Sequence, residues 1–371
     1  MRILFLANAG NIHTAKWVNI LSTKGHEVHL VYIKNHKPGI DIIDPKVQLY
    51  QLPFGGGKSY YLNAYWFQKL AKSIEPDIIN VHYASGYGTL ARISRVKPVA
   101  LNVWGSDVYD FPYQSKKRFN IIVKNLKYAS HIISTSYVMA EQVRELLDEK
   151  NHFVSIVPFG VNLNNFTVDR HNLVDNKIEI SIGTVKTLRR VYDIETQIYA
   201  YKYVIEYFRQ KEVLQSGKNL KFYIYGQGEL ENELKLLVKS LKVEEYVLFM
   251  GYIQNVEIPQ ALQKLDIFVL SSIQESFGVA AVEAFAMELP VVATDADGFK
   301  EIISDGIDGI IVPRKNPEAM GKAIIRLIEN KAERINMGKN GRDKVEKLYN
   351  IDKNVLQMIQ AYENAIKGTG F

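Results

Sequence analysis

The sequence predicts an α/β protein with two doubly wound domains, each a parallel sheet covered by helices on both faces. Its 371 residues exceed what one compact core usually holds. Short apolar runs alternate with amphipathic stretches of helical length, which is typical of parallel sheets. The alternation stops in a segment rich in Asn, Gly and Asp, residues 157–176, and then restarts. We interpret that segment as a linker.

The first half of the chain contains apolar runs of strand length separated by helical stretches. Gly25 closes the first helical stretch and Ser136 opens the last one, as expected for helix ends. The expected strands are residues 2–8, 26–33, 76–83, 98–107, 131–136 and 153–160. The expected helices are residues 13–24, 60–74, 111–129 and 136–150.

The second half repeats the pattern with its own strands. They are expected at residues 177–186, 221–228, 247–253, 266–272, 290–298 and 309–313, and residues 317–367 read as helical. We therefore expect one domain at residues 1–162 and a second at 163–349. Residues 350–371 are expected to form a helix that packs back on the first domain.

The glycine-bearing loops predict where a ligand binds. In doubly wound sheets ligands lie beyond the carboxyl ends of the strands. Loops with glycine follow most of the expected strands in both halves, for example at Gly10, Gly105, Gly226 and Gly278. The sequence therefore predicts two domains that face each other across a cleft lined by these loops.

The composition excludes several classes of protein. The chain has no cysteine, so disulfides, thiolate nucleophiles and cysteine-ligated metals are excluded. Its apolar runs are too short for a signal peptide or for a membrane span of about 20 residues, which favours a cytoplasmic location. The net charge of +6 comes without a nucleic-acid motif. The pair Asp295 and Asp297 is read as a solvated turn, so we expect no metal.

Two glutamates, Glu275 and Glu283, lie in the apolar segment QESFGVAAVEAF. Eight residues span about 12 Å along a helix, and a hydrolytic carboxylate pair needs about 5 to 9.5 Å. The spacing favours carboxylates that hold two ends of one elongated ligand. The alternative is structural, with Glu283 paired to a lysine and Glu275 a solvated cap, and the spacing alone does not separate the two.

The stretch from DIFVLSSIQESFG to DGIDGIIV resembles the signature of the family 4 retaining glycosyltransferases nearly residue by residue. The segments GNIHTAKWVNILSTKGHEVHLV, DIINVHYASGYGTLA, WGSDVY and PFGVNLNNF also resemble that family, so the similarity spans almost the whole chain. It implies the GT-B fold, two facing Rossmann-like domains with an interdomain cleft. It implies an acceptor-binding first domain and a second domain that binds a nucleotide sugar.

The resemblance implies roles for the residues of the glutamate segment. Glu275 would contact hydroxyls of the donor sugar and be the residue most tied to catalysis. Glu283 would bind the ribose hydroxyls, since carboxylates accept from paired hydroxyls. Phe277 and Gly278 would offer backbone N–H groups to the sugar or its phosphate.

The stretch GTVKTLRRVYD departs from the family pattern for holding the diphosphate. Thr184 stands where an arginine is expected, and Asp193 stands where glycine is common. The available cations are Lys186, Arg189 and Arg190, among which we favour Lys186 and Arg190. Two cations would stabilise the charge that builds on a diphosphate leaving group.

Further donor contacts are implied on both sides of the nucleotide. Gly226, in the partial fingerprint YGQG, and Ile253 match positions that flank the base. In the first domain, Gly10 follows the first strand, where the family's loop abuts sugar and phosphate.

The acceptor side is implied in the first domain. Asp107, in WGSD, would accept or orient the proton of the acceptor hydroxyl; the alternative is a helix N-cap. His13, His82 and Tyr83 are further candidates for contacting the acceptor. For His82 the alternative is a buried, hydrogen-bonded side chain, and for His13 a neighbour of a helix cap.

Two segments of the first domain indicate a membrane surface. SYYLNAYWF is rich in aromatic residues, and KKRFNIIVKNLKY reads as a basic helix. Basic and aromatic side chains together suit an anionic membrane surface, so the acceptor would be a glycan or a lipid-linked sugar and the enzyme peripheral on the inner face. A core-facing helix with a solvated lysine face is the alternative.

The leading hypothesis is a retaining, metal-independent hexosyltransferase of bacterial polysaccharide, glycan or glycolipid assembly. It needs no cofactor beyond the nucleotide-diphosphate sugar, which is its donor substrate, and no nucleic-acid partner is expected. A catalytically inert GT-B partner or binding subunit remains an alternative because the phosphate-binding stretch is altered. A nucleotide-sugar epimerase or a phosphorylase on the same fold is a further alternative.

Overall fold

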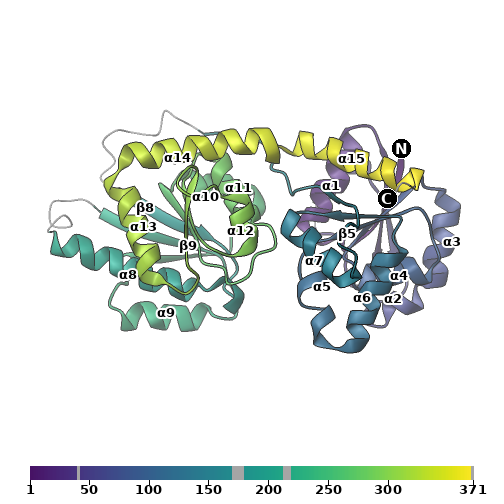
Figure 1. The fold of residues 1–371 in the computed structure, drawn as a ribbon, viewed down its shortest axis with the longest axis horizontal. Helices are drawn as coiled ribbons and strands as arrows, with labels where there is room; N and C mark the ends of the chain where they lie inside the picture. Colours follow the sequence, from purple (N-terminus) through teal and green to yellow (C-terminus); the bar gives the residue numbers. More distant parts are fainter. Residues whose placement is uncertain (40–41, 169–178, 212–218, 369–371) are drawn as a thin grey trace. The chain divides into compact units, whose positions relative to one another are not determined.

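The computed structural model describes residues 1–39, 42–168, 179–211 and 219–368. Part of the predicted linker, residues 169–176, and the first two residues of the strand expected at 177–186 lie outside the described residues. The chain divides into two compact units (Figure 1). Unit 1 comprises residues 1–159 and 352–371, and unit 2 comprises residues 160–351.

Unit 1 is built on a parallel sheet in which, over the described residues, seven strands run in the order β3-β2-β1-β4-β5-β6-β7. The central strands β1 and β4 are almost wholly buried, because side chains on both faces meet helices. The strands are β1 (Arg2–Leu6), β2 (Glu27–Ile33), β3 (Gln48–Leu52), β4 (Ile78–His82), β5 (Val99–Val103), β6 (His131–Ser134) and β7 (Val154–Ile156).

Helices cover both faces of this sheet, with α1 and α15 on one side and α4, α5 and α6 on the other (Figure 1). Side chains at the N-caps fix three of them: Asn11, Ser115 and Ser136 each accept a backbone N–H of the first turn. The helices are α1 (Ile12–Thr23), α2 (Ser59–Leu62), α3 (Ala64–Ile74), α4 (Gly86–Ile93), α5 (Ser106–Tyr109), α6 (Lys116–Tyr128), α7 (Tyr137–Leu147) and α15 (Ile351–Lys367).

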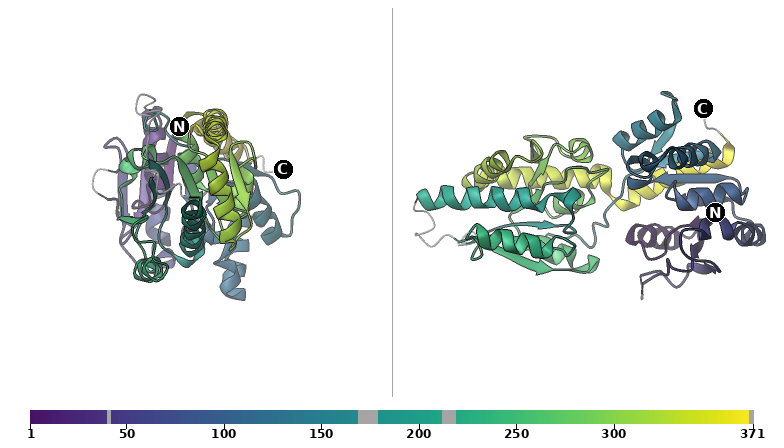
Figure 2. Two further views of the ribbon diagram at one scale, coloured as in Figure 1. Left: turned by 90° about the vertical axis from the view of Figure 1, so that its left-hand side faces the viewer. Right: turned by 90° about the horizontal axis from the view of Figure 1, so that it is seen from below.

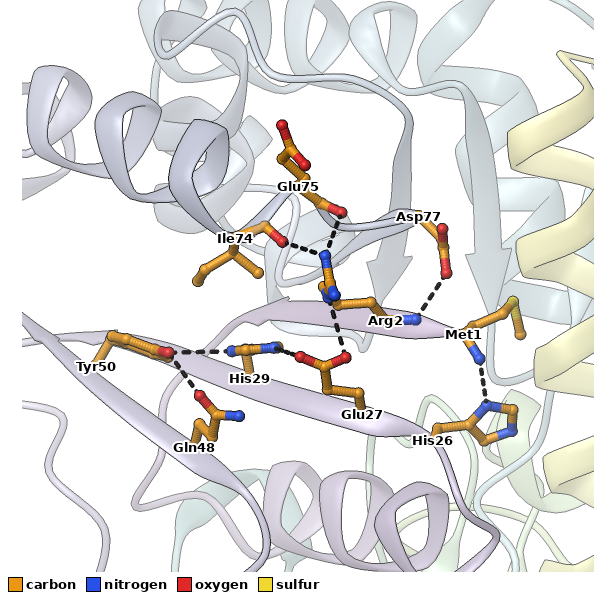
Figure 3. A network of polar contacts seen from close by, with 10 residues as sticks. All are labelled: Met1, Arg2, His26, Glu27, His29, Gln48, Tyr50, Ile74, Glu75 and Asp77. Carbon is orange, nitrogen blue, oxygen red and sulfur yellow. Dashed lines mark hydrogen bonds and ion pairs between the residues drawn. The ribbon is translucent and has the colours of Figure 1, made fainter.

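A polar network ties the strands of unit 1 together near their amino ends (Figure 3). The Arg2 guanidinium donates to Glu27 at 3.0 Å and to the Ile74 carbonyl at 2.9 Å, so it joins β1, β2 and the end of α3. His29 Nε2 and Glu27 Oε1 lie 3.0 Å apart, and His29 Nδ1 and the Tyr50 hydroxyl lie 3.2 Å apart, which extends the network to β3. This edge is therefore occupied by structural contacts, and the opposite edge is where a ligand site is expected.

Unit 2 has the same architecture, with a strand order of β10-β9-β8-β11-β12-β13 among its described residues. Figure 1 shows its helices on both sides of the sheet, and the long helix α8 crosses unit 2 in the right-hand view of Figure 2. The strands are β8 (Glu179–Val185), β9 (Asn219–Tyr225), β10 (Val247–Gly251), β11 (Ile267–Leu270), β12 (Val291–Thr294) and β13 (Gly309–Val312). The helices are α8 (Ile194–Gln210), α9 (Glu231–Ser240), α10 (Ile258–Gln263), α11 (Val279–Ala286), α12 (Asp297–Ile302), α13 (Pro317–Glu329) and α14 (Lys331–Lys344).

The structure confirms the prediction of two parallel-sheet α/β domains, while the cleft between them stays a prediction. The elements that the sequence analysis missed include the edge strand β3 and the helices α4 and α12. The stretch expected to be helical from 317 to 367 is interrupted at Asn330 and again at Asn350, after a π-helical turn over Val345–Tyr349. The last helix, α15, lies in unit 1 from Asp352 onward, where Asp352 and Lys24 of unit 1 form an ion pair of 2.7 Å.

Candidate active site

Each sheet has one topological switch point, where the chain leaves one half of the sheet to build the other. In unit 1 it lies between β1 and β4, and in unit 2 between β8 and β11. Loops that leave such neighbouring strands run in opposite directions and open a crevice beyond their carboxyl ends. The predicted site residues are therefore best judged by whether they reach these two points.

In unit 2 the switch point brings together Lys186 and Glu275. Lys186 directly follows β8 and Glu275 lies in the loop after β11; the Lys186 Nζ and Glu275 Oε2 atoms are 2.8 Å apart. Their side chains are only 15% and 13% exposed. The Lys186 ammonium also lies 4.3 Å from the centre of the Tyr192 ring, and the Ser272 hydroxyl is 3.4 Å from Glu275 Oε2. The sequence predicted both residues, but not that they pair.

The electrostatics of this pair keep the lysine charged. Burial lowers the pKa of Lys186, but the nearby Glu275 carboxylate and Tyr192, with a smaller influence from Glu283, raise it by more, so the net pKa lies above the ordinary value. A buried ammonium that stays protonated is a fixed positive charge beside the loop after β11. Such a charge can stabilise phosphate oxygens that become more negative during a reaction.

Glu283 lies on α11 and is 8% exposed. The helix begins after Gly278, whose φ of 108° is a conformation that non-glycine residues rarely adopt. The Phe277 side chain is buried and contacts Tyr349 edge-on, with 5.8 Å between ring centres. Phe277 thus anchors the loop through its ring.

A glycine of one of the strand-ending loops, which was not among the predicted site residues, supports the loop of Glu275. Gly298, at the start of α12, donates its N–H to the Glu275 carbonyl at 3.0 Å. A Cβ atom at Gly298 would lie 2.7 Å from both the Glu275 oxygen and the Phe277 nitrogen. Only glycine allows α12 to approach this closely. One sign of this role was visible in the sequence, because Gly298 lies at the end of an expected strand and next to the Asp295–Asp297 pair.

That aspartate pair is engaged by basic side chains. Asp295 forms an ion pair of 2.9 Å with Arg314, which also donates to the Ile273 carbonyl, and Asp297 pairs with Lys300 at 2.7 Å. Among the residues that the structure describes, no group of three or more His, Asp or Glu side chains could hold a metal ion.

The other cations of GTVKTLRRVYD are placed differently from Lys186. Arg189 and Arg190 are exposed at the start of a short 3₁₀ helix, Arg190–Tyr192. Thr184, which stands at the expected arginine, is fully buried inside β8. Asp193 has a φ of 48°, so it adopts the left-handed conformation that the glycine common there would favour.

The loop after β9 packs backbone to backbone against the loop after β8. Gly226 has a φ of 139°, and a Cβ atom there would lie 2.0 Å from the Lys186 carbonyl oxygen. The Lys186 N–H donates to the Tyr225 carbonyl at 2.9 Å. Gly226 thus fixes the backbone that carries Lys186. Ile253, which follows β10, is half-buried.

In unit 1 the switch point contains a cavity of about 300 Å³. The predicted residues His82 and Tyr83, which end β4, lie in its wall. The His82 ring is hydrogen-bonded at both nitrogens, to Thr14 at 3.3 Å and to Asn80 at 2.9 Å, and burial lowers its pKa to about 3. Tyr83 has a φ of 75°, which is strained for a non-glycine residue.

His13 and Gly10 lie beside this cavity but not in its wall. The His13 ring stacks on Phe159 with 4.2 Å between ring centres, and its Nδ1 has no hydrogen-bond partner among the described residues. Burial lowers the pKa of His13 to about 3, so the ring is neutral at physiological pH. Gly10 is exposed, and a Cβ atom there would lie 2.8 Å from the Lys37 carbonyl oxygen.

Asp107 makes structural contacts with both of its carboxylate oxygens. Its side chain is 1% exposed, and both oxygens accept backbone N–H groups: Oδ1 from Trp104 and Gly105, Oδ2 from Ala84 at 2.8 Å. Burial raises the pKa of Asp107, and these hydrogen bonds partly oppose the rise. The carboxylate therefore ties the loop after β5 to the loop after β4. It is not the N-cap that the alternative gave it, because the N-cap of α5 is Gly105.

Two family models match the chain and together cover most of it. "Glycosyl transferase 4-like" matches residues 2–136, and "Glycosyl transferases group 1" matches residues 168–344. The second match contains the Lys186–Glu275 pair and α11. The first contains the cavity of unit 1.

Similar proteins have the same arrangement along their chains. An uncharacterized glycosyltransferase of Methanocaldococcus jannaschii is 26% identical over 316 residues, 83% of this chain and 81% of its own. The UDP-Gal:α-D-GlcNAc-diphosphoundecaprenol α-1,3-galactosyltransferase of Escherichia coli is 26% identical over 310 residues, 79% of this chain and 77% of its own.

A solved structure shows the same fold over the full length. The sucrose-phosphate synthase of Thermosynechococcus elongatus matches with a TM-score of 0.83 and 19% identity, covering 100% of both chains. The two family models and the relatives name glycosyltransferases, and the solved structure has the same fold. The chain therefore belongs to the family 4 glycosyltransferases of GT-B fold.

Proposed function

We propose that the chain moves a sugar from a nucleotide-diphosphate sugar to an acceptor hydroxyl, with retention of anomeric configuration and without a metal ion. The observation that carries this proposal is the buried Lys186 ammonium, 2.8 Å from Glu275 at the switch point of unit 2. The resemblance to a retaining family supports the stereochemistry. The name of the Escherichia coli relative supports a UDP-sugar as one candidate donor.

In the proposed reaction, Glu275 accepts from hydroxyls of the donor sugar and Glu283 from hydroxyls of the ribose. Lys186 donates to the diphosphate, where negative charge increases as the bond to the anomeric carbon breaks. The acceptor oxygen attacks that carbon from the same face, and its proton passes to the leaving phosphate. A preorganised ammonium supplies the charge stabilisation that a metal ion provides in other enzymes.

The remaining predicted residues have supporting roles in this proposal. The exposed Arg189 and Arg190 add positive charge near Lys186, and the backbone N–H groups of Phe277 and Gly278 at the start of α11 suit an oxygen-rich group. Gly226 and Ile253 would flank the base.

The acceptor side is proposed to lie in unit 1, beside His13, His82 and Tyr83, while Gly10 stays a proposed donor contact. Asp107 holds the loops after β4 and β5 rather than the acceptor itself. With Asp107 in that structural role, no carboxylate is assigned to take the proton of the acceptor hydroxyl. The departing phosphate then accepts the acceptor's proton.

A docking surface for an anionic membrane is part of the proposal, because a lipid-linked acceptor would be presented there. Residues 53–74, 83–98 and 112–128 hold eleven of the 46 basic residues and none of the 40 acidic residues. The remaining 35 basic and 40 acidic residues give the rest of the chain a net negative charge. Helix α2 packs against α4, and α4 against α6, so these segments form one layer of unit 1.

Exposed aromatic side chains lie in the same layer. Tyr65 on α3 is 67% exposed and Trp66 is 47% exposed. Lys116, Lys117 and Arg118 occupy the first turn of α6, where the helix dipole disfavours positive charge. Three positive charges at this end of the helix lower its stability. Binding to an anionic surface would offset that loss. Over the described residues, no helix is long and apolar enough to cross a membrane, so contact would be peripheral, on the inner face in a cytoplasmic protein.

Vesicle sedimentation tests this surface. Replacing Lys116, Lys117 and Arg118 by glutamine should weaken binding to phosphatidylglycerol vesicles by about 10²-fold, at about 1 kcal/mol per basic residue. Glutamine at Lys235, Lys239 and Lys242, in and after α9 of unit 2, is the matched control and should change little. Equal binding by both triple variants would rule out this docking surface.

The rival hypothesis of an inert subunit rested on the altered phosphate-binding stretch. Lys186 occupies the switch point despite that alteration, which argues for a retained cation site. Incubation with a panel of nucleotide sugars, with product configuration read by NMR and with EDTA present, tests the enzyme directly. We expect release of the nucleotide with one donor, loss of release in Glu275→Ala, and no effect of EDTA. No release with any donor would overturn the enzymatic proposal, and inversion or EDTA sensitivity would overturn its finer parts.

A further inference from the structure

The cavity of unit 1 has a chemistry that identifies a class of acceptor, an inference that rests on the proposed function. It lies at the carboxyl ends of β1 and β4 and measures about 300 Å³, at the small end for ligand pockets. Among the residues that the structure describes, its wall contains no Asp, Glu, Lys or Arg. The lining residues are Asn8, Asn11, Thr14, His36, Tyr60, His82, Tyr83, Ser85, Gly86, Tyr87 and Trp104.

The two histidines of the wall do not make it charged. Burial lowers the pKa of His82 to about 3, and burial also lowers the pKa of His36. Both rings are therefore neutral at physiological pH. The cavity offers hydroxyl, amide and imidazole groups together with aromatic faces, but no counter-charge.

Part of the wall is a fixed aromatic cluster. The Tyr60 and Tyr87 rings meet edge to face with 5.4 Å between centres, and the Tyr87 hydroxyl is 2.8 Å from His36 Nδ1. Gly86 makes room for this cluster, because a Cβ atom there would lie 2.4 Å from Cζ of Tyr60. These contacts come from α2, α4 and the loop after β2, and they hold Tyr60 against the cavity.

A second aromatic wall comes from the loop after β5. The Trp104 ring lies over His82 with 4.2 Å between ring centres. Aromatic faces offer a large apolar surface, and hydroxyl and amide groups beside them offer hydrogen bonds. A sugar ring presents both kinds of surface, apolar C–H faces and a polar rim of hydroxyls. A carboxylate or phosphate would lose its water here without gaining a cation, which is unfavourable.

We infer that this cavity binds an uncharged sugar unit of the acceptor and discriminates against acidic and phosphorylated sugars. Tyr60 is the residue on which specificity depends most, because it is held by Gly86 and Tyr87 rather than by the sheet. A diphosphate of a lipid-linked acceptor would then have to lie outside this cavity. The acceptor's sugar unit and the donor's sugar share this chemistry, so the test must separate them.

Ligand-observed NMR and calorimetry on the full chain, with UDP present, test the class. The probes are the methyl glycosides of glucose, galactose, mannose and N-acetylglucosamine, against methyl glucuronide and glucose 6-phosphate. At least one neutral glycoside should bind at least about tenfold more tightly than both charged sugars. Equal or tighter binding of a charged sugar, or no binding of any neutral glycoside up to 50 mM (about the limit for a weak site, Kd above 1 mM), would overturn the inference.

Variants locate the binding and separate its sources. Tyr60→Ala should weaken the best glycoside about tenfold and Tyr60→Phe should retain it. Tyr199→Ala, at an exposed position on α8 of unit 2, is the matched control. With that glycoside as acceptor in a transfer assay, Tyr60→Ala should raise the KM of the acceptor and leave the KM of the donor unchanged. A rise in the donor KM alone would assign the cavity to the donor sugar. If nucleotides bind unit 2 but no neutral glycoside binds, this inference fails alone; if glycosides bind and no nucleotide sugar does, the proposed function fails.

Discussion

The pair of Lys186 and Glu275 should be a measurable source of stability for unit 2, separate from any role in transfer. Replacing Glu275 by glutamine keeps the shape of the side chain and removes its charge. The ammonium of Lys186 then remains in a site where only 15% of its side chain is exposed. Replacing Lys186 by methionine removes the opposite charge, and the double variant removes both.

The distance sets the size of the effect. At 2.8 Å and an effective dielectric constant of about 20, the attraction is about 6 kcal/mol. The cost of removing two charges from water offsets much of this attraction. The contact of Lys186 with the Tyr192 ring remains in Glu275→Gln. We therefore expect each single variant to lose about 2 to 3 kcal/mol in the free energy of unfolding, and the double variant to lose little more than either.

The position of the tryptophans makes the assay selective. All three, Trp17, Trp66 and Trp104, lie in unit 1, so their fluorescence reports on that unit. Circular dichroism follows both units. Urea unfolding of the full chain should show a shifted circular dichroism transition in each single variant with an unchanged fluorescence transition.

The dependence on pH provides a second reading of the same pair. In the natural chain the raised pKa of Lys186 gives stability that is present below pH 10.5 and lost only as the pH rises through the higher folded value. In Glu275→Gln, burial should lower that pKa, so the stability of the variant should rise between neutral pH and pH 10. Losses that simply add in the double variant, or a flat pH profile in Glu275→Gln, would refute the reasoning.

Three further predictions concern other parts of the two sites. Gly278→Ala should lower the stability of unit 2 by about 1 to 3 kcal/mol, because its φ is 108°, and an unshifted melting curve would contradict this. The stability of unit 1 should fall as the pH drops from 6.5 toward 4, because His13 and His82 are buried in their neutral form. Each histidine should contribute about 1.4 kcal/mol per pH unit. Unfolding followed by tryptophan fluorescence measures this slope, and an unchanged slope in His82→Gln would count against the prediction. Asp107→Asn should keep transfer within about tenfold and Asp107→Ala should destabilise unit 1 by about 1 to 3 kcal/mol, whereas loss of transfer in a stably folded Asp107→Asn would restore the acceptor role.

Much of the fold follows from the spacing of apolar runs. Buried parallel strands such as β11 are continuous apolar segments and were predictable. The edge strand β3 is largely exposed and carries polar residues, so it has no such run. Helix α4 begins in the glycine-rich GYGTLA, where propensity disfavours a helix. Its packing against α2 and α6 supplies the stability that local sequence lacks.

The candidate site was predictable in its identities but not in its pairings. The spacing argued against Glu275 and Glu283 as a hydrolytic pair, and the resemblance to the family made Lys186 a candidate cation. Lys186 and Glu275 lie 89 positions apart in the chain. They meet because β8 and β11 are neighbours in the sheet, and the order of the strands is not visible in the sequence. The sequence did not separate Lys186 from Arg190 for the same reason.

The cavity of unit 1 shows the same limit. Tyr60 and Tyr87 lie 27 positions apart in the sequence, with a strand between them, and nothing in the sequence pairs them. Only the tertiary structure places the Tyr60 ring on Gly86. Asp107 was predicted as a site residue from the sequence. Its hydrogen bond from the N–H of Ala84, in another loop, became visible only in the structure.

Calorimetric titration of UDP, GDP, ADP and dTDP into the natural chain and into Lys186→Met tests most directly the claim that unit 2 binds a nucleoside diphosphate at its switch point. Lys186→Arg is the control that keeps the positive charge. We predict that at least one nucleotide binds the natural chain, that Lys186→Met weakens it by at least about 30-fold, and that Lys186→Arg weakens it less. Equal affinity of the natural chain and Lys186→Met for every nucleotide would contradict the claim.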